Sequence, residues 1–209
     1  MSLTAAIRDA LAAEPSMPVL LGSTDPGVFC AGADLTISDA ERAVVSDLIY
    51  DCCHIIITRP GPVIAVLSGA AVGGGAQLAA ASDLRIANPA AMLRFAGPPG
   101  LNLTVGAWLL PDLVGRGPAM DLVLTGRWLE SPEALALGFL NHVSPEPDVL
   151  AGEIAADLAR RGVAAGISGV KPVMAAGGLL DRLQAERAAN RAAWAQVTGP
   201  VPAPAPGEL

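Results

Sequence analysis

The sequence predicts one α/β domain with a helical region at its C-terminal end. Short apolar runs alternate with helical patterns through the first half of the chain, and helical patterns dominate the second half. The 209 residues suit a single domain, and 52% of them are apolar, which is enough to build a sizeable core. Only 3% are aromatic, so we expect a core of aliphatic side chains with close helix–sheet packing.

In the first half, strands are predicted where short apolar runs are bounded by Gly or Pro. The run at 63–67 is apolar at every position, which is typical of a strand buried on both faces. Ser38 or Asp39 can cap a long helix at 40–58, and Pro60 and Pro62 end it. The other predicted strands are 19–21, 84–87 and 92–95, and the other predicted helices are 3–13 and 76–81.

The second half is predicted to be helical apart from one short strand at 140–143. The predicted helices are 108–114, 118–124, 132–137, 148–160 and 169–197. A tail at 199–209 is too rich in proline to pack. We therefore divide the chain into a core at 1–145, a helical region at 146–198 and this tail.

Composition excludes several classes of protein. The net charge is −7, with 13 basic and 20 acidic residues, so no basic stripe is available for nucleic acid. Cys30, Cys52 and Cys53 are odd in number and no secretion signal precedes them, which favours free thiols in a cytoplasmic protein. The uncharged stretch at 60–82 is interrupted by Gly and Pro, so it predicts a strand, a turn and a helix rather than a membrane span.

Familiar catalytic motifs are absent from the sequence. It contains no phosphate-binding loop, no dinucleotide-binding glycine motif and no nucleophile elbow. Lys171 is the only lysine, which disfavours Schiff-base chemistry. His54 and His142 lack the spacing of metal ligands, so no metal site is predicted.

Two glycine-containing turns are the strongest candidates for a site. The first is 29–35, with the sequence FCAGADL, and the second is 68–77, with the sequence SGAAVGGGAQ. Three glycines at the start of a helix leave backbone N–H groups bare at its positive end, where an anion or a developing oxyanion can bind. A tight packing turn with no ligand explains the same pattern, and the residues alone leave both interpretations open.

Together these turns resemble the crotonase superfamily, the enoyl-CoA hydratase/isomerase family. The segment 29–35 is similar to its F-x-A-G-x-D-[LI] motif, and 62–75 is similar to its P-x-I-A-x-[VI]-x-G-x-[AC]-x-G-G-G motif. Further similar segments, in the same order, are SDLRIA at 82–87, Phe95 with the Pro-Gly turn after it, LTGR at 124–127 and ALALGFL at 134–140. The resemblance spans residues 3–197.

The resemblance implies a spiral of ββα units, with C-terminal helices that build a homotrimer or a hexamer. It implies a coenzyme A thioester as ligand, here an acyl-CoA or enoyl-CoA of fatty-acid metabolism, and no tightly bound cofactor. Two backbone N–H groups would form the oxyanion hole, those of Ala33 and Gly74. The residues expected to flank the coenzyme are Ala31, Gly32, Asp34, Leu35 and Gly73. Leu101 and Trp108 are expected to line the acyl pocket.

The sequence departs from the family at both glutamates that hydratases use. The first position is Gln77, and the second falls in the turn at 99–103, where Gly100 replaces Glu. Between residues 52 and 111 the only carboxylate is Asp83, whose family counterpart opens a strand away from the reacting carbon. An amide cannot take a proton near neutral pH. The sequence therefore favours a protein that binds the thioester without hydrating it.

Two other hypotheses stay open. One is an active hydratase or isomerase (a lyase or isomerase) with a relocated base, for which Asp51 or His54 would be the first candidates. The other is a scaffold subunit that no longer binds coenzyme A. The resemblance begins at the helix at 3–13, so the family's N-terminal hairpin is expected to be absent. Structural roles are expected for other polar and aromatic candidates, namely Tyr50, Asn102, Asp112 and His142.

Overall fold

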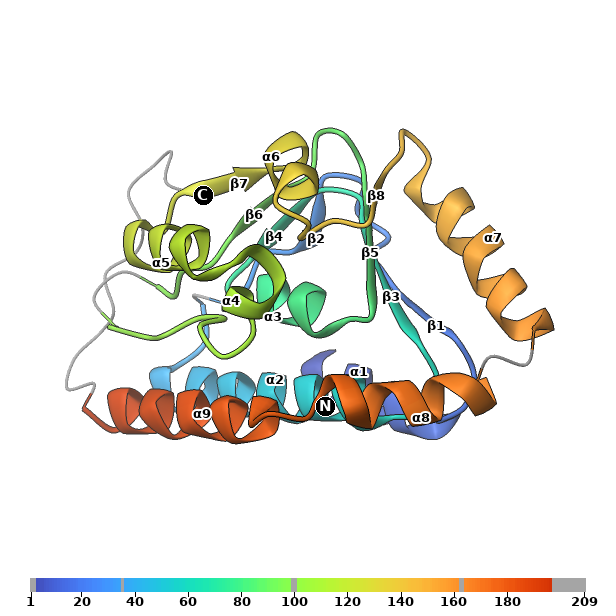
Figure 1. The fold of residues 1–209 in the computed structure, drawn as a ribbon. Helices are drawn as coiled ribbons and strands as arrows, with labels where there is room; N and C mark the ends of the chain where they lie inside the picture. Colours follow the sequence, from blue (N-terminus) through green and yellow to red (C-terminus); the bar gives the residue numbers. More distant parts are fainter. Residues whose placement is uncertain (1–2, 35, 99–100, 162–163, 197–209) are drawn as a thin grey trace.

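The computed structural model describes residues 3–34, 36–98, 101–161 and 164–196, and their strands form two four-stranded sheets (Figure 1). The first sheet is parallel throughout and has the order β1 (Val19–Leu21), β3 (Val63–Leu67), β5 (Leu84–Ala87) and β8 (His142–Val143). The second has the order β2 (Val28–Cys30), β4 (Ala70–Val72), β6 (Met92–Arg94) and β7 (Trp128–Glu130). Only the β6–β7 pair of the second sheet is antiparallel.

The chain builds both sheets by repeating one unit. A strand of the first sheet is followed by a strand of the second and then by helix: β1 and β2 lead to α2 (Asp39–Thr58), and β3 and β4 lead to α3 (Gly74–Ala81). The third unit, β5 and β6, leads to α4 (Leu110–Val114) and α5 (Arg116–Thr125). This repetition is the ββα spiral that the family resemblance implied.

A layer of helices lies beneath the sheets in the view of Figure 1. It contains α1 (Leu3–Ala13), α2, α8 (Ala164–Met174) and α9 (Leu179–Ala195), and α9 runs alongside α2. Helix α6 (Ser131–Ala136) follows β7, whereas α7 (Pro147–Arg160) packs against β1, β3 and β5. The predicted cap of α2 is confirmed, because Ser38 and Glu41 form a reciprocal capping box.

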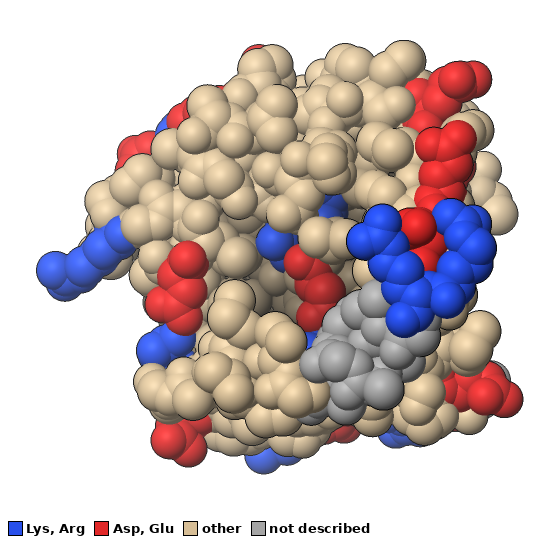
Figure 2. All heavy atoms as spheres, turned by 45° about the vertical axis from the view of Figure 1, so that its right-hand side comes forward, with Lys and Arg blue, Asp and Glu red and all other residues tan. Residues whose placement is uncertain are grey.

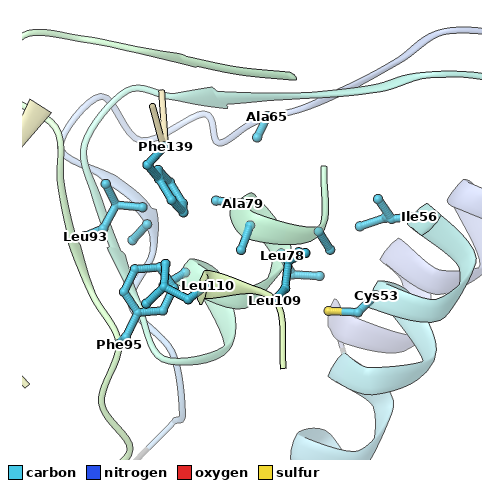
Figure 3. Packing of buried hydrophobic residues seen from close by; sticks show 14 of the residues in the cluster. Cys53, Ile56, Ala65, Leu78, Ala79, Leu93, Phe95, Leu109, Leu110 and Phe139 are labelled. Atoms are coloured by element: carbon cyan, nitrogen blue, oxygen red, sulfur yellow. The ribbon is translucent and has the colours of Figure 1, made fainter. Parts of the chain in front are cut away.

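The main core is formed by side chains from both sheets together with α2 and α3 (Figure 3). Phe95 and Phe139 meet edge to face within it, with ring centroids 5.7 Å apart. Every residue of β3 is buried, as predicted. Those of its side chains that face the other way form a small second cluster with α7, made by Ile64, Val66, Ile86 and Ala151.

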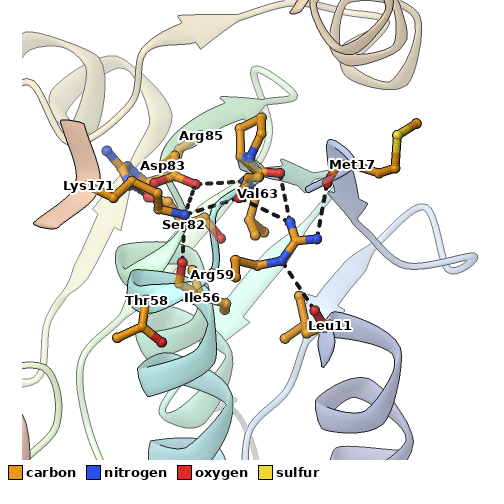
Figure 4. Close-up of polar contacts among 12 residues, drawn as sticks. Leu11, Met17, Ile56, Thr58, Arg59, Val63, Ser82, Asp83, Arg85 and Lys171 are labelled. Atoms are coloured by element: carbon orange, nitrogen blue, oxygen red, sulfur yellow. Dashed lines mark hydrogen bonds and ion pairs between the residues drawn. The ribbon is translucent and has the colours of Figure 1, made fainter. Parts of the chain in front are cut away.

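Two buried cations fasten the helical layer to the first sheet (Figure 4). The Arg59 guanidinium donates hydrogen bonds to five carbonyl oxygens, those of Leu11, Glu14, Met17, Gly61 and Pro62. Lys171 Nζ donates to Ile56 O at 2.7 Å and pairs with Asp83 Oδ2 at 2.7 Å. The lone lysine therefore has a structural role, and it holds α8 against α2 and the start of β3.

Several predicted boundaries differ from those observed. Strands β2, β4 and β7 were missed, because each has only three residues and adjoins a turn, which leaves no periodicity to detect. The single helix predicted at 169–197 is wrong: α8 and α9 are separate, and Gly177 and Gly178 between them have φ values of +82° and +84°. The predicted helix at 108–114 begins only at Leu110, and the strand at 140–143 is reduced to β8.

On the face shown in Figure 2, acidic and basic side chains are interspersed among uncharged ones, and a group of basic side chains surrounds an acidic one. At the end of α7, for example, Asp157 pairs with Arg160 at 3.1 Å and with Arg161 at 2.7 Å. Within the described part of the chain, no helix is both long enough and apolar enough to cross a membrane. The predicted tail at 199–209 lies outside the described residues.

Candidate functional site

A cavity of about 540 Å³ lies between the ends of the second sheet's strands and the helical layer. One of its walls is formed by main chain from the two glycine turns, at 30–34 and 72–74. The facing wall is formed by side chains of α2 and α9, and residues 94–98 with Leu103 and Val105 close a third side. The cavity therefore brings together segments of the first half of the chain with α9 from its C-terminal region.

The two glycine turns approach each other closely. Gly32 has φ +87° and Gly73 has φ +55°, conformations that L side chains rarely adopt. A Cβ on Gly32 would lie 2.9 Å from Val72 O, and one on Gly73 would lie 3.2 Å from Ala96 O. The residues predicted to hold the coenzyme and the oxyanion lie on this wall, with Ala31, Gly32, Ala33 and Asp34 from the first turn and Gly73 and Gly74 from the second.

Helix α3 points its N-terminal end at the cavity. The Gly73 N–H donates to Arg94 O at 3.0 Å, and the Gln77 N–H donates to Gly73 O at 3.1 Å. Gly74 is the first residue of α3, where a helix offers its own N–H groups no acceptor. The Gly74 N–H and the positive end of the helix are therefore suited to an oxygen that carries partial negative charge.

The cavity offers few groups that could exchange a proton with a ligand. Of the described residues that line it, only Asp34 carries a carboxylate. That carboxylate accepts hydrogen bonds from the Thr36 N–H at 2.8 Å and the Thr36 hydroxyl at 2.7 Å. These bonds lower the pKa of Asp34 from its ordinary value, which weakens it further as a base.

Gln77, where hydratases of the family carry a glutamate, is only 4% exposed but contributes to the cavity wall. The Trp108 indole N–H donates to Gln77 Oε1 at 3.1 Å. Because the indole nitrogen can only donate, this bond assigns the amide oxygen to the Trp108 side. The side chain is thus held by its neighbours in one orientation.

Behind Trp108 lies a buried carboxyl group that sequence reasoning missed. Glu186 of α9 is 6% exposed, and its oxygens accept hydrogen bonds from Gly106 N–H at 2.9 Å, Trp108 N–H at 3.1 Å and Tyr50 O–H at 3.1 Å. Burial raises the pKa of Glu186 to about 7, and these hydrogen bonds oppose the increase. Asn190 extends the network by donating to the Tyr50 oxygen at 2.7 Å.

The sequence does contain a signal for this network. In α9 the buried positions are Leu179, Leu183, Glu186 and Asn190, which recur every three or four residues. Two polar residues thus continue an apolar stripe, and such residues need buried partners. The groups that bond to Glu186 and Asn190 come from α2 and from the loop before α4. The pattern in α9 therefore predicts buried polar groups without identifying what they contact.

Other candidates from the sequence lie away from the cavity. Leu101 and Trp108 are buried, at 5% and 2% exposure, and are not among the residues that line the cavity. The apolar lining residues from the same loop are Leu103 and Val105. Asp51 pairs with Arg187 at 2.7 Å, and His54 is exposed on α2. Two further candidates, Leu35 and Gly100, lie outside the described residues. Among the residues that are described, no three His, Cys, Asp or Glu side chains group as metal ligands do.

A spiral of ββα units with a cavity walled by two glycine turns defines a crotonase-type protein. The chain belongs to the enoyl-CoA hydratase/isomerase family, whose model matches residues 3–198. It is similar to a crystal structure of enoyl-CoA hydratase from Bacillus anthracis, with a TM-score of 0.74 and 27% identity over 95% of this chain and 83% of that one.

Two relatives show the similarity in sequence. YngF of Bacillus subtilis (strain 168), named as an enoyl-CoA hydratase/isomerase, is 39% identical over 155 residues, which are 69% of this chain and 58% of the relative. The human mitochondrial enoyl-CoA hydratase domain-containing protein 2 is 38% identical over 133 residues, 59% of this chain and 44% of the relative. The chain thus matches about half the length of these two relatives.

Proposed function

We propose that the chain binds an acyl-CoA or enoyl-CoA thioester in the 540 Å³ cavity and hydrates it poorly or not at all. In this proposal the N–H groups of Ala33 and Gly74 hold the thioester oxygen, and the residues around Gly32 and Gly73 flank the coenzyme. The observation that carries the proposal is the approach of the two glycine turns to each other on one cavity wall. Family membership supports the choice of a thioester as ligand.

The poor hydration follows from the protonation chemistry of the wall. Gln77 can position a ligand or a water molecule, but its amide does not take a proton near neutral pH. Asp34 is the one carboxylate on the described part of the wall, and its hydrogen bonds with Thr36 lower its pKa. A well-placed acid or base contributes about 10²–10⁴ in rate, so losing both glutamates removes most of the usual catalysis.

A second candidate function is an active hydratase or double-bond isomerase with a relocated base. Asp51 and His54 do not line the cavity, so neither supports it in this structure. Glu186 is the observation in its favour, because its pKa of about 7 suits a group that exchanges protons near neutral pH. Trp108 and Gln77 stand between Glu186 and the cavity, which favours a supporting role instead.

The assembly proposed with this function is a cytoplasmic homotrimer or hexamer. Val170, Val173 and Met174 support it, because these apolar side chains of α8 are 55%, 73% and 78% exposed. Exposed apolar groups gathered on one helix are typical of a contact surface between subunits.

A single-turnover assay tests the catalytic part of the proposal. Protein in excess is mixed with enoyl-CoA thioesters of several chain lengths, and loss of the conjugated thioester absorbance is followed. We expect turnover by the wild type to be absent, or at least about 10²-fold slower than turnover by the variant that carries both Gln77→Glu and Gly100→Glu. The Gln77→Leu variant is the matched control and should stay inactive.

Turnover by the wild-type protein would instead support the relocated base. Binding is measured separately, as the shift in melting temperature on adding acyl-CoA. A saturable shift that exceeds the shift with coenzyme A alone is expected. An equal or absent shift would favour the scaffold hypothesis over thioester binding.

A further inference from the structure

Two buried hydrogen-bond donors on the cavity wall have no acceptor among the described residues. They are Arg42 Nε in α2 and Trp194 Nε1 in α9, and both residues line the cavity. Arg42 is only 7% exposed. A buried N–H without a partner is unfavourable and rare in folded proteins, so two of them on one cavity wall call for an explanation.

The contacts between α2 and α9 place these donors at the same end of the cavity. Tyr50 meets Asn190 at 2.7 Å, and Asp47, one turn earlier in α2, meets Arg191 at 2.6 Å. The two helices therefore run antiparallel, and the next turn toward the start of α2 faces Trp194. Both helices are continuous over this region, so their register places Arg42 and Trp194 on neighbouring turns of the facing helices.

The charges around Arg42 leave its Nε–H available to a ligand. One of its terminal nitrogens pairs with Asp39, an acidic residue that does not line the cavity. Arg42 Nε–H is therefore left as a hydrogen-bond donor. The polar group of Trp194 is its indole N–H, which can only donate. Ile37, Val45, Ser46 and Ile49 line the cavity beside Arg42. The Asp34 carboxylate interacts electrostatically with Arg42, but it accepts its hydrogen bonds from Thr36.

We propose that this end of the cavity receives a carbonyl or carboxylate oxygen carried by the acyl chain of the bound thioester. The substrate class is then an oxo-acyl or carboxy-acyl thioester rather than a plain hydrocarbon one. The inference rests on the proposed thioester site, whose glycine wall holds the other end of the same ligand. An sp² oxygen has two lone pairs, and it can accept from an N–H donor such as Arg42 Nε–H or Trp194 Nε1–H.

Matched thioesters test this assignment. Dissociation constants are measured by calorimetry for coenzyme A alone, for acyl-CoA of four to ten carbons, and for the ω-carboxy and ω-1-oxo acyl-CoA of each length. At one length or more we expect the oxygen-bearing ligand to bind at least about tenfold more tightly than its hydrocarbon counterpart. A preference for the carboxylate alone, or for both, distinguishes the two oxygen sources.

Variants then assign the preference to the two donors. Arg42→Met should abolish it, and Trp194→Phe, which keeps the ring and removes the N–H, should reduce it by about threefold or more. Arg8→Met is the matched control, since Arg8 is partly exposed on α1 and pairs with Asp9 at 2.8 Å. It should leave the preference unchanged. If Arg42→Met proves unfolded by circular dichroism, the Trp194→Phe result decides.

Each outcome separates this inference from the proposed function. Hydrocarbon and oxygen-bearing acyl-CoA binding equally, and both more tightly than coenzyme A, would overturn the inference and leave the thioester site intact. A preference that survives in both Arg42→Met and Trp194→Phe would also overturn it. Equal weakening of coenzyme A itself by these variants would assign the donors to the coenzyme instead. No binding of any thioester would contradict the proposed function as well.

Discussion

The strand-end wall of the cavity is built from main chain, whereas the wall formed by α2 and α9 is built from side chains. On the first wall Gly32 and Gly73 let two turns approach each other, and the polar groups presented are backbone N–H groups. The second presents side chains of α2 and α9, and behind it Tyr50 bonds to both Glu186 and Asn190 across the two helices. Substitutions should therefore disrupt the two walls by different physical mechanisms.

The difference teaches which residues each wall depends on. The main-chain wall depends on the absence of Cβ atoms at a few positions and is indifferent to most neighbouring side chains. The helical wall depends on the identity of residues far apart in sequence, since Tyr50 and Glu186 are 136 positions apart. The effect of a substitution on stability should depend mainly on steric clashes at the first wall, and mainly on hydrogen bonding and protonation at the second.

The largest effect is expected from Gly75→Ala, which tests the main-chain wall. A Cβ at Gly75 would lie 2.5 Å from Cys30 O and 2.6 Å from Cys30 Cβ, so α3 would have to move away from β2. We expect the free energy of unfolding to fall by about 3 kcal/mol or more, as in the severest overpacking. Urea denaturation measures this change, and acyl-CoA binding should be lost with it because Gly74 moves too.

Gly152→Ala in α7 is the matched control. Nothing lies within 4 Å of a Cβ at this position, so alanine should stabilise the helix by about 0.5–1 kcal/mol. If Gly75→Ala unfolds at the same denaturant concentration as wild type, the main-chain wall is looser than its geometry indicates, and the contrast between the walls fails.

These two walls also differ in how far sequence could predict them. Each glycine turn is a local run of residues, so its motif fixes both its conformation and its place after a strand, and Ala33, Gly74 and Gln77 were found on the cavity as expected. The α2–α9 wall depends on helix register, which only the folded chain determines. Trp108, in the loop before α4, is not among the lining residues, and its indole N–H donates to Gln77 Oε1.

The second prediction concerns the pH dependence of the helical wall. The pKa of Glu186 is raised to about 7 in the folded protein, above the ordinary 4.5 of an unfolded chain. Between these values the folded state binds more protons than the unfolded state, so stability falls as pH rises from about 4.5 to 7 and is level above that. A shift of this size corresponds to a loss on the order of 3 kcal/mol.

Unfolding by urea across pH 4.5–8 measures this loss, with Glu186→Gln for comparison. The variant keeps the size of the side chain but does not titrate. The difference in free energy of unfolding between wild type and variant should therefore fall as the pH rises from about 4.5 to 7. Groups with a lowered pKa, such as Asp47 between Arg187 and Arg191, titrate in both proteins and cancel. Parallel pH profiles for the two proteins would show that Glu186 is solvated and not part of a closed network.

The smallest effect is expected from Trp108→Phe, which breaks the hydrogen bond linking the helical wall to Gln77. The ring still fills its buried site, but Gln77 Oε1 loses its donor at 3.1 Å. Because Gln77 borders the cavity, water can replace part of this bond, and we expect a loss of about 1 kcal/mol. A double-mutant cycle with Gln77→Met isolates the contact, and the coupling free energy should be about 0.5–1.5 kcal/mol.

If the two changes were additive within about 0.3 kcal/mol, Trp108 would not position Gln77. The two walls would then be energetically independent, and Gln77 would be free to turn toward a bound thioester.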